Sequence, residues 1–371
     1  MDKPIRKHIV ISAVNIRKGG TLTVLRDCLR YLSSQHSLQV TALVHSSNLI
    51  GLEGIHYIEI PWSTKTWLHR LWCEYITMYK ISKTLQPVDL WFSLHDTTPR
   101  VQARRQAVYC HTSFPFMKLK WRDWFMDVKI PLFRLLTRFA YKINVRRNNY
   151  LVVQQQWMRE SLSRLIKYPQ EKIIVAPPAF SLPDIPNIPV QTESPIFFFP
   201  ATADCHKNFE TLCRAAELLQ DSMNAPPFKL VLTIDGTENR YAASIKSRFG
   251  HVRSIDFHGY MSKQELYEYY AKTTCLVFPS RIETWGLPIS EFKPTGKPMI
   301  LADLPYAHET AEGAKQVIFF PETQALTLAV YMYTLLKKIA FGFIYETVPG
   351  SLPKHPYANN WEHLFNLLLE Q

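Results

Sequence analysis

The chain has 371 residues, 47% hydrophobic and 20% charged, which excludes a wholly disordered protein and suggests about two globular domains. Its six scattered cysteines, without a C-x-x-C pair, favour reduced, buried thiols in a cytosolic protein over a disulfide framework. The net charge of +12 is uneven, because residues 1–150 hold 23 basic and 9 acidic side chains and residues 151–371 hold 20 and 22. Nucleic acid, an acidic membrane surface and a phosphorylated substrate are possible partners of the basic half.

The first half alternates strand and helix patterns. Leucines at three- and four-residue spacing predict helices at Thr21–Ser34 and Trp67–Leu85. Short apolar runs predict strands at His8–Val14, Leu38–His45, His56–Trp62, Leu90–His95, Gln106–Thr112 and Tyr150–Gln154. No run approaches the roughly 18 apolar residues of a membrane-spanning helix, and the run at 9–14 is too short for a secretion signal.

A proline-rich stretch, Pro177–Pro195, separates this half from a second alternation. There we expect strands at Ile196–Phe199, Lys229–Ile234, Ile255–Phe257, Cys275–Phe278 and Pro298–Leu301, and helices at Asn208–Leu219, Arg240–Arg248, Lys263–Lys272, Thr323–Ala340 and Asn360–Leu369. The fold class is α/β, with two Rossmann-like domains facing across a cleft that holds ligands. The predicted organisation is an N-terminal domain at 1–178, a linker at 179–195, a C-terminal domain at 196–345, and a helical segment at 346–371 that packs back toward the first domain.

The segment Cys275–Glu291, CLVFPSRIETWGLPISE, carries the clearest chemical signal. Its strand leads into a loop with Glu283 and Gly286, and Pro288 predicts a nearby helix start with Glu291 on the first turn. Free amides at a helix start hold anions, and a glycine lets a ligand approach the backbone. Carboxylates on both sides suit sugar hydroxyls at the two ends of a diphosphate. Glu291 alone would fit equally well a stabilising interaction with the helix dipole.

This segment, E-T-W-G-L-P-I-S-E, resembles the E-x7-E signature of retaining GT-B glycosyltransferases and is most similar to glycosyltransferase family 4. Residues 255–312 carry the resemblance strongly, through Phe257–Gly259 and Glu265–Tyr269 before the signature and Gly296–Ile300 after it. The first half resembles the family only in its architecture and in the pair Gly19-Gly20. The resemblance implies the GT-B fold and a nucleotide diphosphate sugar as donor.

Site residues follow from the resemblance, position by position. Glu291 would bind ribose hydroxyls, Glu283 donor-sugar hydroxyls and Lys207 the diphosphate, while His111 would lie near the anomeric carbon. The predicted catalytic residues are His111, Lys207 and Glu283. The predicted donor-binding residues are Gly19, Gly20, Thr202, Lys207, Gly259, Tyr260, Glu283, Trp285, Gly286, Leu287 and Glu291.

One position departs from the family's pattern. Members often have an arginine about five residues before the diphosphate lysine, and Thr202 stands there in this chain. Either His206 or an arginine from elsewhere replaces that cation, or the phosphate site is weaker. His111 considered without the resemblance would fit a buried core histidine, and His95-Asp96 fits a turn as well as an acceptor site.

Residues 118–147 combine lysine and arginine with tryptophan and phenylalanine. The pattern favours a helix lying on anionic lipid, with membrane-facing residues Lys118, Lys120, Trp121, Arg122, Trp124 and Lys129. A solvated basic helix is the alternative. Nucleic acid is less favoured, because no recognition motif accompanies the charge.

The resemblance therefore predicts a retaining hexosyltransferase that moves a sugar from a nucleotide diphosphate sugar to a lipid-linked or soluble saccharide. The setting would be bacterial surface polysaccharide biosynthesis, of O-antigen, capsule or exopolysaccharide, at the cytoplasmic face of the membrane. No cofactor is expected, and no metal, because the chain lacks a D-x-D motif and a metal-ligand pattern. Two alternatives stay open: a non-catalytic nucleotide-sugar-binding subunit and a GT-B isomerase acting on a nucleotide sugar.

Overall fold

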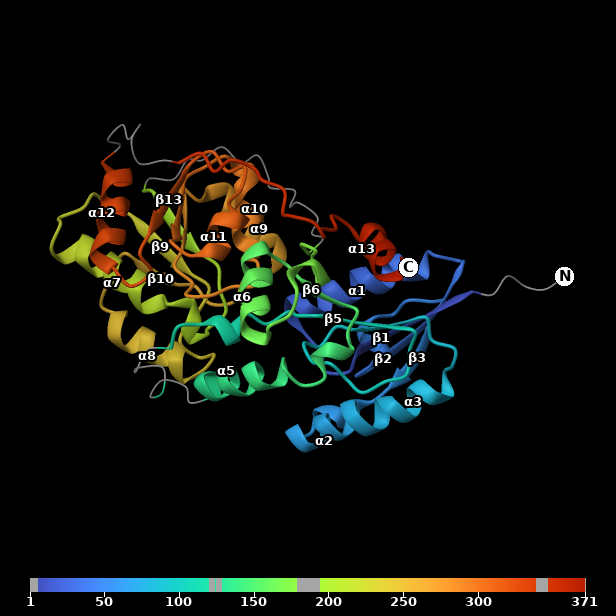
Figure 1. Cartoon of the computed structure of the whole chain (residues 1–371). Helices are drawn as coiled ribbons and strands as arrows, with labels where there is room; N and C mark the ends of the chain where they lie inside the picture. The colour runs from blue at the N-terminus through green and yellow to red at the C-terminus, as the bar shows by residue number, and fades with distance from the viewer. Residues whose placement is uncertain (1–5, 120–123, 125–128, 179–193, 338–345, 371) are drawn as a thin grey trace. The chain divides into compact units, whose positions relative to one another are not determined.

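The computed structural model describes residues 6–119, 124, 129–178, 194–337 and 346–370. The chain divides into two compact units (Figure 1). Unit 1 comprises Met1–Phe116, Phe133–Phe180 and Pro353–Gln371, and unit 2 comprises Met117–Leu132 and Ser181–Leu352.

Unit 1 is built on a seven-stranded parallel sheet of order β3-β2-β1-β4-β5-β6-β7. The strands are β1 Lys7–Ala13, β2 Leu38–Val44, β3 His56–Glu59, β4 Leu90–Ser93, β5 Arg105–Tyr109, β6 Tyr150–Val153 and β7 Ile173–Val175. Chain order reverses at β1, because β2 pairs on one side of it and β4 on the other. Such a switch point opens a crevice at the carboxyl ends of the strands, where ligands bind in sheets of this kind.

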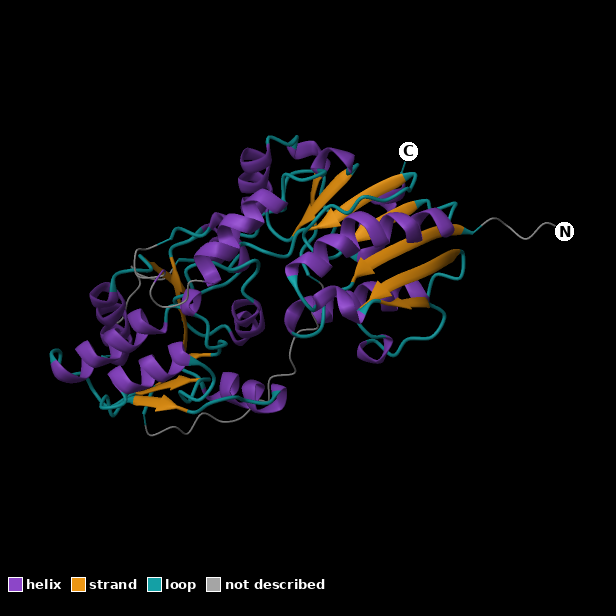
Figure 2. Cartoon of the chain, turned by 90° about the horizontal axis from the view of Figure 1, so that it is seen from below, coloured by secondary structure: helices purple, strands orange, loops and turns teal. Residues whose placement is uncertain are grey.

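Helices lie on both faces of this sheet (Figure 2). The helices in this part of the chain are α1 Gly19–Ser33, α2 Trp67–Trp72, α3 Met78–Thr84, α5 Lys129–Ala140, α6 Gln156–Ile166 and α13 Trp361–Leu369, and the first four residues of α5 belong to unit 2. The last helix, α13, lies against α1 (Figure 1), where the Phe365 ring stacks on Tyr31 with centroids 5.7 Å apart and meets Phe92 edge-on at 5.9 Å. The C-terminal residues thus complete the core of unit 1.

Unit 2 has a six-stranded parallel sheet of order β10-β9-β8-β11-β12-β13. The strands are β8 Ile196–Phe199, β9 Lys229–Leu232, β10 Ile255–Phe257, β11 Cys275–Phe278, β12 Met299–Ala302 and β13 Val317–Phe320, and the helices are α7 Phe209–Asp221, α8 Arg240–Phe249, α9 Lys263–Lys272, α10 Leu287–Phe292, α11 Pro305–Thr310 and α12 Ala325–Leu336. Its strands β8, β11, β12 and β13 are continuously apolar, as in Phe197–Phe199, because both faces of the sheet are covered there. The switch point here lies between β8 and β11.

Several predicted boundaries are wrong. The helix predicted at Trp67–Leu85 is divided into α2, a π-helical turn at Cys73–Thr77, and α3, and the turn buries both Cys73 and Glu74. The strand predicted to end at Thr112 ends at Tyr109, so that His111 lies in the loop beyond it. Strand β3 ends at Glu59, because Pro61 cannot donate to a ladder and begins a 3₁₀ turn.

The division of the chain also differs from the predicted boundary at 178, since Met117–Leu132 groups with unit 2. One contact accounts for part of this grouping: Arg281 Nη2 donates to the carbonyl oxygen of Lys118 at 2.7 Å. Most of the predicted linker, 179–193, lies outside the described residues. Residues 353–371 belong to unit 1.

All six cysteines are free and buried, as the sequence predicted. Burial raises the pKa of Cys73 to about 12, so this thiol stays protonated at neutral pH. Among the described residues, no helix combines the length and the apolar character that crossing a bilayer requires.

Candidate functional site

Lys207 and Glu283 form an ion pair at the switch point of unit 2. Lys207 ends a 3₁₀ turn after β8, and Glu283 lies in the loop between β11 and α10. Lys207 Nζ donates to Glu283 Oε1 at 2.6 Å, with the two side chains only 16% and 13% exposed. The partial burial strengthens this pair relative to one in water.

Asn208 holds the Lys207 turn in place. Its backbone adopts a left-handed conformation, φ 63°, which ends the turn and allows α7 to begin at the next residue. Its side-chain amide donates to the carbonyl oxygens of Pro279 at 3.1 Å and Glu322 at 2.7 Å. The turn after β8 is therefore tied directly to the loop that follows β11 and carries Glu283.

The cation that the family places near Thr202 is absent from that position. Thr202 is exposed, and its hydroxyl donates to Asp204 Oδ2 at 2.6 Å, so a carboxylate lies there instead. Burial, followed by the nearby charge of Lys207, lowers the pKa of His206 to about 4. These two effects favour the neutral form of His206 at pH 7. Arg281, which no sequence motif indicated, donates its backbone N–H to the carbonyl oxygen of His206 at 2.7 Å.

Gly286 shapes the loop before α10. Its φ of +89° is the left-handed conformation that favours glycine, and an added Cβ would lie 3.3 Å from Ile289 Cδ1. Trp285, just before it, donates its indole N–H to Ser290 Oγ at 2.9 Å, while its carbonyl accepts from the Thr310 hydroxyl. Helix α10 begins at Leu287. Glu291 consequently lies on the second helical turn, and its predicted place on the first turn is wrong.

Glu291 is oriented by Tyr270 of α9. The buried Tyr270 hydroxyl donates to Glu291 Oε2 at 2.9 Å. Burial raises the pKa of Glu291, and the hydrogen bond from Tyr270 opposes that shift. A carboxylate fixed through one oxygen in this way is suited to accept hydroxyl groups of a ligand.

Two further predicted donor residues follow β10. Gly259 also has a positive φ, +89°, and an added Cβ would lie 3.2 Å from Asp235 Oδ2, so that only glycine fits without strain. The neighbouring side chain, Tyr260, is almost fully exposed. Leu287 is the first residue of α10 and is half-buried.

The predicted residues of unit 1 lie at the carboxyl ends of its central strands. Gly19 and Gly20 begin α1, and no atom lies within 4 Å of a Cβ added at either one, which leaves open space beside the backbone. His111 follows β5, is buried, and stacks on Tyr109 with ring centroids 4.3 Å apart. Its backbone N–H donates to Asp96 Oδ1 at 2.6 Å.

A buried polar network, missed in the sequence, supports this loop. Asp96 Oδ1 also accepts from the Thr112 N–H at 2.9 Å and the Tyr141 hydroxyl at 3.2 Å. The preceding His95 meets Ser12 Oγ at 2.9 Å through Nε2 and lies 3.6 Å from Glu74, which pairs with Arg70. The sequence signal that could have indicated this network is the pair Arg70 and Glu74, two opposite charges at i and i+4 in a largely apolar helical region.

These groups predict a pH dependence. Burial lowers the pKa of His95 to about 4 and of His111 to about 3, and raises that of Asp96 to about 6. As the pH falls below 6.5, the two histidines bind protons in the unfolded chain but not in the folded one, so the free energy of unfolding falls. Between pH 6 and 4, Asp96 binds a proton in the folded chain but not in the unfolded one, so it raises the free energy of unfolding. With two histidines against one aspartate, we expect a net loss from these groups. In urea unfolding between pH 7 and 4.5, His111→Gln should lose less stability than wild type and Asp96→Asn more; parallel curves would contradict these pKa shifts.

The predicted residues are thus distributed over both units. Gly19, Gly20 and His111 belong to unit 1, and the remaining catalytic and donor-binding residues belong to unit 2. Among the predicted membrane-facing residues, Lys118 contacts Arg281 through its carbonyl, Trp124 is exposed, and Lys129 begins α5. Lys120, Trp121 and Arg122 lie outside the described residues.

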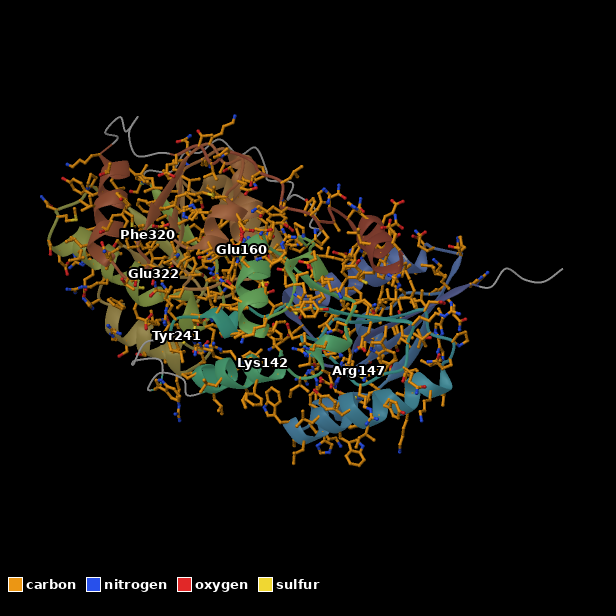
Figure 3. The ribbon with its side chains drawn as sticks, in the orientation of Figure 1. Lys142, Arg147, Glu160, Tyr241, Phe320 and Glu322 are labelled. Atoms are coloured by element: carbon orange, nitrogen blue, oxygen red, sulfur yellow. The ribbon has the colours of Figure 1, made fainter. Side chains whose placement is uncertain are left out.

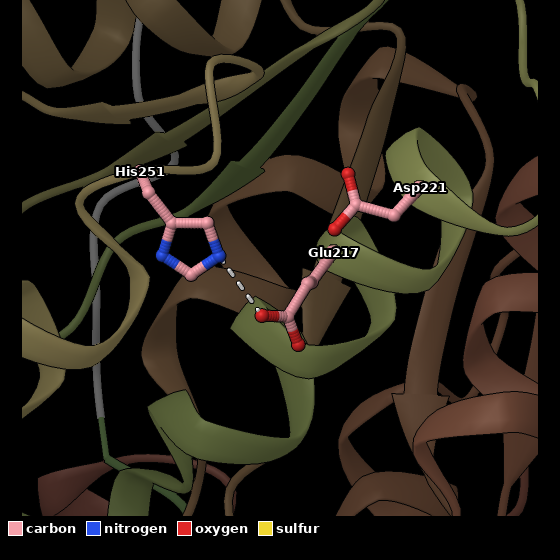
Figure 4. Close-up of side chains that lie close together, drawn as sticks. All are labelled: Glu217, Asp221 and His251. Carbon is pink, nitrogen blue, oxygen red and sulfur yellow. Dashed lines mark hydrogen bonds and ion pairs between the residues drawn. The ribbon is translucent and has the colours of Figure 1, made fainter.

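One group in the described part of the chain has the composition of a metal site. Glu217 and Asp221 of α7 lie near His251, with His251 Nε2 3.1 Å from Glu217 Oε1 (Figure 4). Arg214 pairs with the same Glu217 carboxylate. The guanidinium competes with any cation for that carboxylate, and this surface group is separate from the Lys207–Glu283 pair.

Comparison with known proteins gives a family match for the second half of the chain. Residues 183–338 match the family model described as "Glycosyl transferases group 1". The chain is also 25% identical over 218 residues to the O-antigen chain mannosyltransferase RfbU of Salmonella typhimurium, a match that covers 58% of this chain and 56% of that protein.

Several solved structures resemble the whole chain. A glycosyltransferase from Rickettsia africae gives a TM-score of 0.64 at 14% identity, covering 91% of this chain and 89% of that one. Alr3699/HepE from Anabaena, in complex with UDP-glucose, gives 0.62 at 15%, covering 89% and 90%. The apo lipopolysaccharide outer core galactosyltransferase WaaB gives 0.63 at 13%, covering 97% and 98%. The chain therefore has the GT-B fold, and the family match supports a glycosyltransferase of that fold.

Proposed function

We propose that this protein is a retaining glycosyltransferase that uses a nucleotide diphosphate sugar. The observation that carries the proposal is the contact between Lys207 and Glu283 at the switch point of unit 2, in the same loop as Gly286, whose positive φ favours glycine. A lysine at this point can neutralise a diphosphate, and a carboxylate next to it can accept the hydroxyls of the attached sugar. The nucleotide-sugar donor agrees with the UDP-glucose bound to Alr3699/HepE.

In the proposed mechanism, the acceptor hydroxyl attacks the anomeric carbon from the face that the nucleotide diphosphate leaves. The bond between the anomeric carbon and the diphosphate oxygen breaks, a bond to the acceptor oxygen forms, and the leaving diphosphate takes the acceptor's proton. Lys207 stabilises the charge that develops on the diphosphate, as preorganised electrostatics require. Arg281 is our candidate for the second cation, because its charge acts on His206, next to Lys207. No metal ion is required in this scheme.

Glu291 supplies the nucleotide end of the proposed site. Its carboxylate, oriented by Tyr270, would accept the two ribose hydroxyls. His111, with a pKa of about 3, is neutral at pH 7 and can exchange hydrogen bonds with a sugar without adding charge near the anomeric carbon.

The acceptor is proposed to be a lipid-linked saccharide in the assembly of a bacterial surface polysaccharide. The names of two similar proteins support this choice, one an O-antigen mannosyltransferase and the other a lipopolysaccharide outer core galactosyltransferase. Such an acceptor would place the protein at the cytoplasmic face of the membrane, where the basic charge of residues 1–150 would favour anionic lipid.

A transfer assay tests the proposal. Purified protein is incubated with a panel of nucleotide sugars and lipid-linked saccharides, with and without EDTA, and the products are identified by mass spectrometry and NMR. We expect transfer with an unchanged anomeric configuration in the presence of EDTA. An inverted configuration would exclude the retaining mechanism. A rearranged nucleotide sugar without acceptor would indicate the isomerase, and donor-dependent thermal stabilisation without turnover would indicate a binding subunit.

A further inference from the structure

Helix α2 exposes large apolar side chains. Trp67 is 62% exposed and Leu68 77%, and Leu71 and Trp72 are exposed with them. These positions, i, i+1, i+4 and i+5, lie on one helical face. Four such side chains together exceed the scattered apolar exposure of ordinary surfaces and mark an interaction site.

The buried face of α2 and of the π-helical turn that follows it carries the charged residues. Glu74 is 1% exposed and pairs with Arg70, which also donates to the carbonyl oxygen of His95 at 3.1 Å. A helix at a water-facing surface normally has the reverse arrangement, with charge outside and apolar side chains inside. The exposed face of α2 is therefore apolar, which favours contact with another apolar surface over contact with water.

Helix α5 continues this surface. Leu135, Leu136 and Phe139 are exposed at i, i+1 and i+4, and Phe139 is 73% exposed. The two helices meet where the Trp67 ring lies 6.5 Å from that of Phe133. We call the exposed apolar residues of α2 and of α5 from Phe133 onward, all in unit 1, the apolar face.

The segments that carry the apolar face are rich in positive charge. Across 60–88 and 129–149, the sequence holds ten lysines and arginines and a single acidic residue, the buried Glu74. A pocket of about 500 Å³ is lined by Lys142, Arg146 and Arg147, which follow α5, and by Lys167, which follows α6 (Lys142 and Arg147 are labelled in Figure 3). No carboxylate lines this pocket, which therefore suits an anionic group such as a phosphate.

We propose that unit 1 docks on an anionic bilayer, with the apolar face inserted among the lipids and the basic pocket holding a phospholipid phosphate. Apolar side chains beside lysine and arginine are the combination that binds reversibly to such surfaces. The charge argues against a second copy of this chain as the occupant, because a two-fold contact would bring the same positive residues together. This inference rests on the proposed transfer to a lipid-linked acceptor. It adds α2 to the membrane-binding surface, although α2 contains none of the residues predicted to face the membrane.

Vesicle co-sedimentation tests the docking without donor or acceptor. The full chain is mixed with vesicles of phosphatidylcholine alone or with added phosphatidylglycerol, at low and high salt. We expect binding only to the anionic vesicles, weakened by salt. The variant with Trp67→Ser, Leu68→Ser and Trp72→Ser should lose at least roughly tenfold in partition coefficient. The variant with Lys142→Gln, Arg146→Gln and Lys167→Gln should lose roughly 100-fold.

Matched controls carry equivalent changes on unit 2. Leu326→Ser with Val330→Ser removes exposed apolar side chains of α12, and Arg248→Gln, Arg253→Gln and Lys315→Gln removes three exposed charges. Both controls should bind like wild type, and all variants should keep the wild-type melting temperature. Equal losses in the controls, or equal binding to neutral vesicles, would overturn the proposal.

Two further measurements distinguish the other occupants. Sedimentation velocity without vesicles should show no dimer that the Trp67→Ser, Leu68→Ser, Trp72→Ser variant dissociates; such a dimer would assign the apolar face to self-association. Thermal stabilisation by glycerol phosphate, without vesicle binding, would assign the pocket to a soluble phosphate and overturn the lipid assignment. Failure of glycosyl transfer on a soluble acceptor would count against the proposed function alone.

Discussion

We expect the replacement of Lys207 by methionine to lower kcat/KM for sugar transfer by about 100- to 1,000-fold. The substitution removes the ammonium group that would stabilise the leaving diphosphate. It also leaves the Glu283 carboxylate, 13% exposed, without its partner and therefore repelling a bound phosphate. The binding of a nucleoside diphosphate should weaken far more than that of the nucleoside, as titration calorimetry can measure. Equal losses for both ligands would place the phosphates elsewhere.

A double-mutant cycle separates two effects of Lys207→Met on affinity: the loss of the Lys207 cation and the repulsion from the unpaired Glu283 carboxylate. Glu283→Gln should reduce turnover and alter the choice of donor sugar with a smaller effect on nucleoside diphosphate affinity. In the double variant Lys207→Met, Glu283→Gln, the part of the affinity loss caused by the unpaired carboxylate should be recovered. If recovery is complete, Lys207 acts only on Glu283 and not on the diphosphate.

We expect the replacement of Glu291 by alanine to weaken nucleotide binding by roughly 2–4 kcal/mol, because two ribose hydroxyls would lose their acceptor in a partly buried site. Unlike the Lys207 variant, Glu291→Ala should weaken nucleoside and nucleoside diphosphate binding to the same extent. The measurement is the dissociation constant of both ligands at pH 7. An affinity unchanged within twofold would remove Glu291 from the ribose site.

Tyr270→Phe is the control for orientation. It removes only the hydroxyl that donates to Glu291 at 2.9 Å and keeps the buried ring. The expected loss is about 0.5–1.5 kcal/mol, smaller than for Glu291→Ala, because the carboxylate remains and only its orientation is relaxed. A larger loss than for Glu291→Ala would mean that Tyr270 acts mainly on the packing of α9.

The sequence by itself determined all strands of the two sheets except β7 and β13, and the local form of the loop between β11 and α10. Apolar runs predicted every strand of unit 1 except the three-residue β7, and periodic leucines predicted α1. Gly286 and Pro288 signalled the turn and the helix start, because glycine adopts positive φ and proline suits a first helical turn. Signals of this kind act within a few residues and can be recognised in one chain.

Only the tertiary structure decided which distant residues meet. Lys207 and Glu283 are 76 positions apart and come into contact because β8 and β11 are neighbours in the sheet, which no local pattern specifies. Burial likewise favours the neutral form of His206, which no local pattern in the sequence indicates. The same holds for α2: its sequence shows apolar and charged residues at helical spacing, but the sheet and its surroundings determine which face is buried. Here the packing placed the Arg70–Glu74 pair inside and the tryptophans outside, because His95 offers that pair polar partners that the apolar face lacks.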